Sequence, residues 1–469
     1  MNMLPDGAEE RLLANANVIA NACNQAGAQQ WDIVGFQAYG QQLDIEAGKV
    51  TMAAGGGEGG FGVRVVQNGR FGFAHMVDVT GAEKAVQQAI KIAAMSPKID
   101  GFVLPSEQDA APVAGLFDSA ILDVQPETLL EQADALLASV ASLDQRAVVT
   151  GGGLGVSATA SILMTSEGIE SSGVTTSHGL GVQVTIDVDG GLTSSYQGES
   201  SRSLMNDVPA CVEQAVHWAQ ITQHPIAMDS GAVDAPVLFT SEGIAPLFSM
   251  VVPPAMTGEK LVRKESFWSG KQNQRVLADH LSIVDEGRLE GGMSSGARDG
   301  EGVPRRQQTL INDGHLVGSL WSTRDAAQQV AEGRIEAAIS TGSASAGGHQ
   351  SPPSTGCTEL MLSSKRGGQS WDQLVEQMDN GFIVNGVMGA HTANPTSGDF
   401  SVTTSSILRV VDGEVMGPLK QAGLSGNLAR SLNQKVVLGD DARCQGSYSS
   451  GRMHLPAVLL YDELRINPA

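Results

Sequence analysis

The chain has 469 residues, of which 41% are hydrophobic and 17% charged, and its formal net charge is −22. This length predicts two or three domains, and the balance of apolar and charged residues excludes a disordered chain. The strong negative charge disfavours direct binding of DNA or RNA, because it would repel phosphate backbones.

Residues 1–110 are predicted to form an N-terminal α/β domain. Apolar residues from Leu12 to Cys23 recur at the spacing of one helical face, which indicates a helix. Three strand-like runs follow, at 32–39, 43–50 and 62–76. The Asn68-Gly69 pair inside the last run favours a two-residue hairpin turn, because both residues tolerate positive φ.

Residues 111–234 are predicted to form a central strand-rich domain with helices, entered through a proline-containing linker at about 103–112. Pro126 stands in the first turn of an amphipathic helix. Strand patterns cover 147–197, and a further helix is expected near 208–221.

Residues 235–469 are glycine-rich and are predicted to form a C-terminal domain. Hairpin turns are predicted at Asn312-Asp313-Gly314 and Asp412-Gly413. Short helices are expected near 324–332 and 371–378. The predicted fold class is α+β: an N-terminal α/β region with antiparallel hairpins and flanking helices, then a mainly antiparallel β domain with short helices.

The cysteines and the N-terminal sequence indicate a cytoplasmic protein. Four cysteines lie far apart and form no C-x-x-C pair: Cys23, Cys211, Cys357 and Cys444. So few cysteines in a long chain suggest a reducing compartment. The first residues do not resemble a secretory leader, and no window is as long and apolar as a membrane span.

Two short glycine motifs are interpreted as turns and loops. Gly57, Gly59 and Gly62 spell G-x-G-x-x-G, but a strand-like run follows instead of the helix that a dinucleotide site requires. The G-x-S-x-G at 292–296 follows a polar, turn-like segment instead of the strand that leads into a nucleophile elbow. We therefore expect a flexible surface loop there.

The histidines give no metal motif of their own. None of the nine is followed by Glu, and no two stand four residues apart on a predicted helix. Four residues could converge in space, but their spacing alone gives no support for a site: His349, His391, Cys444 and His454. From the residues alone we predict no catalytic constellation and no metal ligands.

Three parts of the chain resemble the TldD/PmbA family. The first combines Gly62-Val63-Arg64-Val65 with Gly69-Arg70-Phe71-Gly72-Phe73-Ala74, and the second is Asp299-Gly300-Glu301-Gly302-Val303-Pro304 with the Asn-Asp-Gly turn after it. The third is a series in the last part of the chain: Ser340-Thr341-Gly342, Gly348-His349, Gly398-Asp399-Phe400-Ser401, Asp412-Gly413-Glu414 and Ala422-Gly423-Leu424-Ser425-Gly426-Asn427-Leu428. The order of this series is similar to the PmbA branch, also called TldE.

The resemblance implies that this chain lacks the zinc site of TldD-like members. Those proteins carry H-E-x-x-x-H on a helix and a distant Cys, which together hold zinc. At the corresponding positions this chain has Ser249, Met250 and Pro254, which supply neither good zinc ligands nor a general base. The two prolines at 253 and 254 would also disrupt the helix. Cys444 resembles the distant Cys, although a packing role is favoured for it.

The function implied is that of a non-catalytic subunit. It would partner a TldD-like subunit, which supplies the zinc, in the proteolysis of unfolded peptides. The residues expected nearest the substrate chamber are His349, Gly398, Asp399, Phe400 and Ser401, and the competing interpretation is that they only stabilise loops. No cofactor, nucleic acid or membrane is expected for this chain.

Two other functions stay open. One is a homodimeric peptide-binding or chaperone-like protein without protease activity, and the family label "modulator of DNA gyrase" would then describe an indirect effect. The other is an independent hydrolase, which needs a nucleophile and base pair that the sequence does not reveal.

Overall fold

The computed structural model describes residues 3–189, 191–228, 231–345, 348–448 and 451–468. Its N-terminal half contains a six-stranded antiparallel sheet with the order β3-β2-β1-β4-β5-β6. These strands are β1 (Gln30–Glu46), β2 (Lys49–Gln67), β3 (Arg70–Met76), β4 (Ala147–Thr165), β5 (Glu170–Val188) and β6 (Gly191–Ser201). The hairpin between β2 and β3 turns at Asn68 and Gly69, both at positive φ, as predicted.

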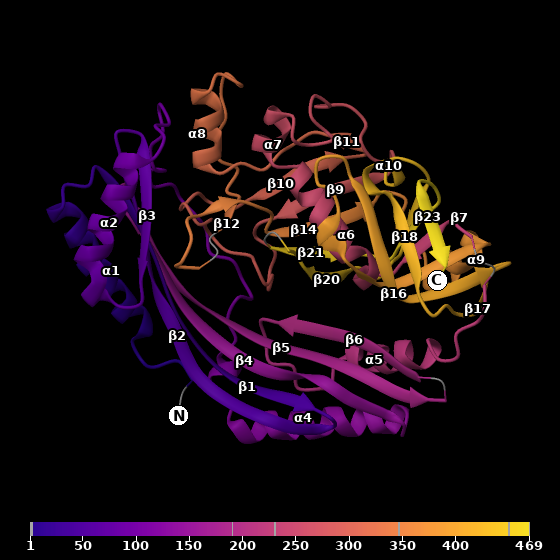
Figure 1. Cartoon of the computed structure of the whole chain (residues 1–469). Coiled ribbons are helices and arrows are strands. Elements are labelled where there is room, and N and C mark those ends of the chain that lie inside the picture. The colour runs from indigo at the N-terminus through magenta and orange to yellow at the C-terminus, as the bar shows by residue number, and fades with distance from the viewer. Residues whose placement is uncertain (1–2, 190, 229–230, 346–347, 449–450, 469) are drawn as a thin grey trace.

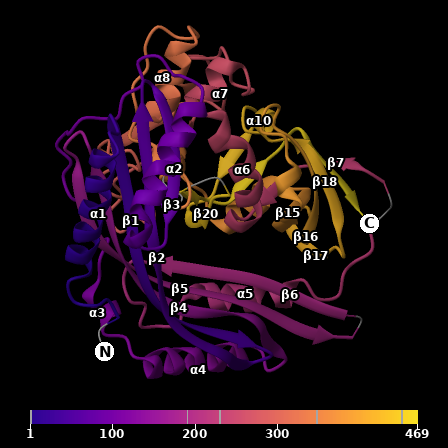
Figure 2. The ribbon, with the colours of Figure 1, turned by 60° about the vertical axis from the view of Figure 1, so that its left-hand side comes forward.

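Helices cover one face of this sheet. They are α1 (Ala8–Gln25), α2 (Ala82–Met95), α4 (Pro126–Leu143) and α5 (Ala210–Ile221), with the short α3 (Ser119–Leu122) between α2 and α4. Apolar residues of these helices share one hydrophobic core with alternate residues of the strands. Figure 1 shows α4 along the outer side of the bent sheet, and the C-terminal half lies on the inner side in both views (Figure 2).

The predicted domain boundary at residue 110 falls inside this unit. Strand β4 pairs with β1 from Asp32↔Thr165 to Asp44↔Gly153, so segments on both sides of the boundary form one sheet. Residues 103–112 have no helix or strand, as expected of a linker, but they connect two parts of the same sheet. The physical reason is that three strands alone would leave an open edge and a smaller core.

The C-terminal half contains two larger sheets. The six-stranded one consists, in order, of β11 (His315–Leu316), β10 (Gln307–Asn312), β9 (Leu281–Glu286), β14 (Glu359–Ser364), β21 (Arg452–Leu455) and β20 (Arg443–Gly446). The nine-stranded one consists of β19 (Val436–Leu438), β22 (Val458–Leu460), β8 (Val237–Phe239), β15 (Gly381–Met388), β16 (Asp399–Val411), β18 (Ala422–Asn427), β23 (Leu464–Pro468) and β7 (Val233–Asp234), with β17 (Glu414–Pro418) beside β16. A small pair joins β12 (Ala344–Ser345) to β13 (Ser354–Thr355). Most pairings are antiparallel, and the predicted α+β class is confirmed.

Five α-helices are described in this half: α6 (Ser241–Ala255), α7 (Gly258–Arg263), α8 (Thr323–Ala331), α9 (Trp371–Met378) and α10 (Leu428–Ser431). Helix α6 lies within the C-terminal core, and its Leu247 and Phe248 are fully buried. It is continuous, so the expected disruption by Pro253 and Pro254 is wrong. Both prolines lie in its last turn, and burial of the helix compensates for the missing N–H groups. No helix in the described part of the chain is both long and apolar enough to cross a bilayer.

Candidate functional site

Helix α6 carries the positions that the resemblance compares with a zinc motif. Thr240 begins the helix by accepting a hydrogen bond from the Gly243 amide at 3.0 Å. The Ser249 hydroxyl is buried, accepts a hydrogen bond from the Tyr448 amide at 2.7 Å and lies 3.1 Å from the Ser447 hydroxyl. The hydroxyl is therefore engaged with the segment that follows β20.

Three potential metal ligands converge on the sheet that contains β20. They are Glu359 of β14, Cys444 of β20 and His454 of β21, and their ligand atoms all lie within 4.8 Å of one another. Strand register produces this cluster, because Cys444 pairs with His454 and Glu359 pairs with Arg452, two residues before His454. Residues two apart on a strand point to the same face of the sheet.

Burial governs the electrostatics of this Glu359–Cys444–His454 cluster. The Glu359 carboxylate has no exposed surface; its Oε2 lies 2.8 Å from His454 Nε2, and its Oε1 accepts the Ser294 amide at 2.6 Å. Desolvation of its sulfur, with a smaller contribution from the Glu359 charge, raises the pKa of the Cys444 thiol to about 11, although the residue as a whole is exposed and the Arg452 charge acts against the rise. The thiol is thus protonated at neutral pH.

The G-x-S-x-G motif forms a loop beside this cluster. In addition to the contact of the Ser294 amide with Glu359, the loop receives Arg202 from the segment after β6. The Arg202 guanidinium donates to the carbonyl oxygens of Gly292, at 3.3 Å, and Met293. The motif is a loop, as predicted, although Gly292 and Ser295 within it are buried. The hydrogen bonds from Arg202 hold this loop of the C-terminal half against the N-terminal half, which explains the burial.

The predicted histidines have separate surroundings. Cys444 and His454 come together, whereas His391 lies in the short helix Ala390–Thr392. The His349 ring lies 5.2 Å from the Phe36 ring and 5.9 Å from the His75 ring, centroid to centroid, so it packs against the N-terminal sheet. Burial and the neighbouring His75 lower the pKa of His349, which favours its neutral form.

Of the other predicted chamber residues, Gly398 precedes β16, and Asp399, Phe400 and Ser401 begin this strand of the nine-stranded sheet. Phe400 is buried in the C-terminal core, whereas Asp399 is exposed and accepts a hydrogen bond from Asn427 at 2.7 Å. The structure thus places the predicted chamber residues in two groups, with His349 against the N-terminal sheet and the others in the C-terminal sheet.

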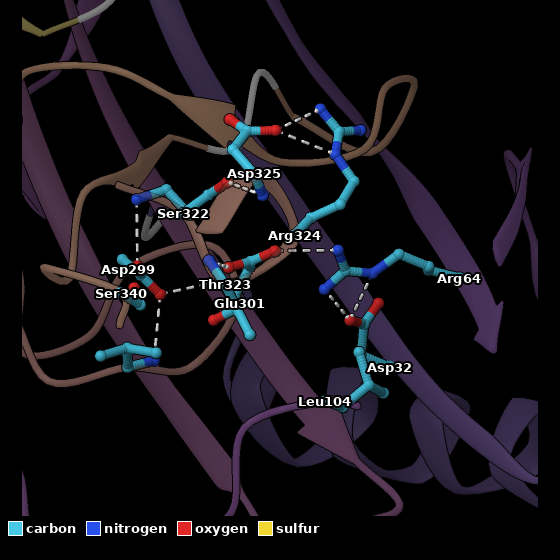
Figure 3. A network of polar contacts seen from close by, with 12 residues as sticks. Asp32, Arg64, Leu104, Asp299, Glu301, Ser322, Thr323, Arg324, Asp325 and Ser340 are labelled. Carbon is cyan, nitrogen blue, oxygen red and sulfur yellow. Dashed lines mark hydrogen bonds and ion pairs between the residues drawn. The ribbon is translucent and has the colours of Figure 1, made fainter. Parts of the chain in front are cut away.

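A buried polar network connects the two halves (Figure 3). Arg64 of β2 has a fully buried side chain; its Nε donates to Asp32 of β1 at 2.8 Å, and its Nη1 donates to Glu301 at 3.1 Å. Glu301 also accepts the Thr323 amide at 2.6 Å, at the start of α8. Burial raises the pKa of Asp32, and the adjacent Arg64 acts against this rise. The network therefore fixes the position of the C-terminal half against β1 and β2.

An open groove of about 1070 Å³ lies on the N-terminal sheet. Its lining comes from the middle of β1, β2, β4 and β5, with Tyr196 of β6. Leu154 and Val156 of β4 are buried in the core with the helices, so the alternate residues Gly153 and Gly155 face the other side. The small residues leave the backbone accessible on this face of the sheet. We call the groove on this face the sheet groove.

Comparison with known proteins identifies the family. A family model described as the PmbA/TldA metallopeptidase C-terminal domain matches residues 232–467, and one described as domain 1 matches residues 31–93. The chain belongs to the PmbA/TldD family. Within it, metalloprotease PmbA of Escherichia coli O157:H7 is 25% identical over 458 residues, which cover 96% of each chain. An uncharacterised protein of Methanocaldococcus jannaschii is 24% identical over 433 residues, covering 92% of this chain and 95% of that protein.

A solved structure of the PmbA/TldD family shares the fold. TldE from Thermococcus kodakarensis has a TM-score of 0.85 at 22% identity and covers 96% of this chain and 99% of its own. This similarity confirms the architecture and, at that level of identity, carries no further conclusion about activity.

The residues of α6 do not fit the zinc site expected of a metallopeptidase. The Ser249 hydroxyl is used by the backbone of Tyr448, Met250 packs on the core, and Pro254 has no donor atom in its side chain. Zinc in proteins takes Cys, His and carboxylate ligands. These three positions of α6 therefore offer no suitable ligand set.

Glu359 is the residue of the Glu359–Cys444–His454 cluster that sequence reasoning missed. It begins a strand whose Leu360 and Leu362 are buried. A carboxylate within such an apolar strand is itself a signal, because a buried charge requires a partner.

Proposed function

We propose that this chain is a non-catalytic subunit that acts with a zinc-containing TldD-like partner in the proteolysis of unfolded peptides. The observation that carries the proposal is the composition of α6, where Ser249, Met250 and Pro254 stand at the positions compared with the zinc motif. A chain without this motif contributes binding surface, while the partner contributes the metal-activated water.

The sheet groove supports this role. An unfolded peptide offers backbone N–H and C=O groups along its length, and a sheet recognises such a chain through its own backbone. The part of β2 from Lys49 to Gly60 pairs with β1, and β3 pairs only from Phe61 onward. That part of β2 therefore presents a strand edge beside the groove, where an extended segment can align.

The test compares three samples: the chain alone, its H-E-x-x-x-H homologue alone, and the mixture. The substrate is an unstructured polypeptide such as reduced casein. We expect cleavage in the mixture, loss of cleavage with a chelator, and co-elution of the two chains. Replacing the Glu of the partner's motif by Gln serves as the control and abolishes cleavage.

Two outcomes contradict the proposal in different ways. Chelator-sensitive cleavage by the isolated chain would show that it is a peptidase itself. Binding of unfolded casein by a homodimer, with no cleavage in the mixture, would support the chaperone-like alternative instead.

A further inference from the structure

We propose that Glu359, Cys444 and His454 form a zinc-binding site in this chain. Ser249, Met250 and Pro254 of α6 take no part in it, whereas Cys444, which resembles the distant Cys of TldD-like members, is joined by two ligands from outside that motif. The site goes beyond the proposed subunit role. The three side chains come from three adjacent strands of one sheet, β14, β21 and β20, and offer one oxygen, one nitrogen and one sulfur ligand. This ligand set suits zinc, which accepts Cys, His and carboxylate groups together.

The geometry is close to that of a bound site. The three ligand atoms lie within 4.8 Å of one another, and ligand atoms around tetrahedral zinc are roughly 3.3–3.8 Å apart, given the usual bond lengths. Small changes of side-chain rotamer close the difference. Because the backbone positions are fixed by strand pairing at Cys444↔His454 and Glu359↔Arg452, the strands do not need to move.

The surroundings supply the support that a metal site requires. The amide of Ser294 holds Glu359 Oε1, which orients the carboxylate. Glu359 is fully buried, whereas Cys444 is exposed, so the cluster has an anchored inner ligand and an entry path from solvent. With three protein ligands, the fourth position is left for water or for a group from a partner chain.

The same residue types could also serve as a Cys–His–Glu nucleophilic site, and the structure favours metal binding over it. In such a triad the sulfur and the carboxylate contact opposite nitrogens of the imidazole, which keeps them apart. Here the Cys444 sulfur and the Glu359 carboxylate oxygen themselves lie within 4.8 Å of each other, as ligands of one metal ion do.

The test measures zinc binding by the full chain after removal of metal, using competition with a chromophoric chelator. We expect one zinc ion per chain. Cobalt in place of zinc should give the charge-transfer absorption of a cobalt–thiolate bond, which reports on the Cys444 sulfur directly. Cys444→Ser should abolish this band, and Cys444→Ser and His454→Gln should each weaken zinc binding at least about 100-fold, since even supporting residues contribute up to that factor.

Matched controls are Cys211→Ala, a buried cysteine of α5, and His315→Gln, an exposed histidine on β11 of the same sheet. Both should bind zinc as the unchanged chain does, and circular dichroism without metal checks that every variant folds. Zinc binding that is absent from the full chain, or that neither Cys444→Ser nor His454→Gln weakens, overturns the proposal. Labelling of Cys444 by a peptide chloromethyl ketone, blocked by His454→Gln, would overturn it in favour of the nucleophilic site.

These results are distinguishable from a failure of the proposed function. Loss of zinc binding at this cluster leaves partner-dependent cleavage intact, whereas cleavage by the isolated Cys444→Ser chain would contradict the subunit role and not the ligand assignment.

Discussion

At position 64 a guanidinium with no exposed surface lies between carboxylates from opposite halves of the chain. Asp32 and Glu301 are themselves buried, so the three groups together carry one uncompensated negative charge. Such a cluster is stable only while every charge keeps its hydrogen bonds. Arg64 therefore has more influence on stability than its single charge would suggest.

We predict that Arg64→Met destabilises the fold by about 3–5 kcal/mol, because two buried carboxylates lose their shared partner. Urea unfolding followed by circular dichroism measures the loss. The matched control is Arg430→Met, since Arg430 is exposed and its ion pair with Glu463 is worth about 0–1 kcal/mol. Similar effects of the two substitutions would contradict the importance of the buried network.

The Asp299 carboxylate in the same region predicts a pH dependence. Burial, followed by the charge of Glu301, raises the pKa of Asp299 to about 6. An unfolded aspartate titrates near about 4, so between about pH 4 and 6 the folded state binds more protons than the unfolded state. The contribution of Asp299 to stability is thus present below about pH 4 and falls as pH rises, by at most about 1.4 kcal/mol per pH unit.

We predict that Asp299→Asn removes this pH dependence of stability. It also lowers the free energy of unfolding by an amount that does not vary with pH. The loss arises because the Asp299 Oδ2 that accepts the Ala344 amide at 3.0 Å is replaced by an NH₂ group. Urea unfolding at several pH values from 4 to 8 measures both terms. Stability curves that stay parallel across the whole range would show that Asp299 does not titrate in this window.

At the scale of elements, helix α2 lies directly on β3 because residue 72 has no side chain. A Cβ on Gly72 would lie 1.9 Å from the Ala89 carbonyl oxygen and 2.5 Å from the Ala93 amide nitrogen. Backbone atoms cannot move aside as a flexible side chain can. A methyl group at this position therefore forces the helix away from the sheet.

We predict that Gly72→Ala costs about 1–3 kcal/mol, the usual range for overpacking. The control is Gly56→Ala in β2 of the same sheet, where a Cβ meets nothing within 4 Å, and there we expect a change within about 0.5 kcal/mol. Urea midpoints of the two variants make the comparison. If Gly72→Ala were neutral, α2 and β3 would not be in contact as described.

The sequence predicts elements well where local signals decide them. The Asn68-Gly69 turn sets a hairpin, and the helix expected near 371–378 is observed as α9. Strand partners are not local: β1 pairs with β4 across more than a hundred residues, so one sheet extends across the predicted boundary at residue 110. The prolines of α6 mislead for the same reason, because packing of the whole helix outweighs local preference.

The candidate site is even harder to predict from local sequence signals. Its residues at 359, 444 and 454 follow no helical or strand spacing with one another, and the register of three strands brings them together. Family resemblance identified Ser249 and Cys444 as positions of interest, but only the pairing of β14 with β21 reveals Glu359.

At the scale of the whole molecule, charge is distributed unevenly between the surface and the interior. Arg64 is fully buried and Arg202 and Arg305 are partly buried, while the net charge is −22. Burial lowers the pKa of Arg202, and the charge of Glu359 opposes this. Arg64 and Arg202 connect the two halves of the chain, whereas Arg305 contacts Thr358 within the C-terminal half.

The sheet groove gives the last prediction, which rests on the proposed function. Gly179 of β5 lines the groove, and a Cβ there meets only the Ser200 hydroxyl, at 3.8 Å, so Gly179→Trp fills the groove without disturbing the sheet. We expect hydrolysis of casein by the mixture with the zinc partner to fall at least about tenfold, equivalent to about 1.4 kcal/mol of lost substrate binding, with the thermal unfolding midpoint unchanged. Gly173→Trp is the matched control, because Gly173 lies on the same strand, has nothing within 4 Å of its Cβ and is outside the groove lining. Equal activity of the two variants would show that substrate does not pass through the groove, because only one of the two bulky side chains lies in its path.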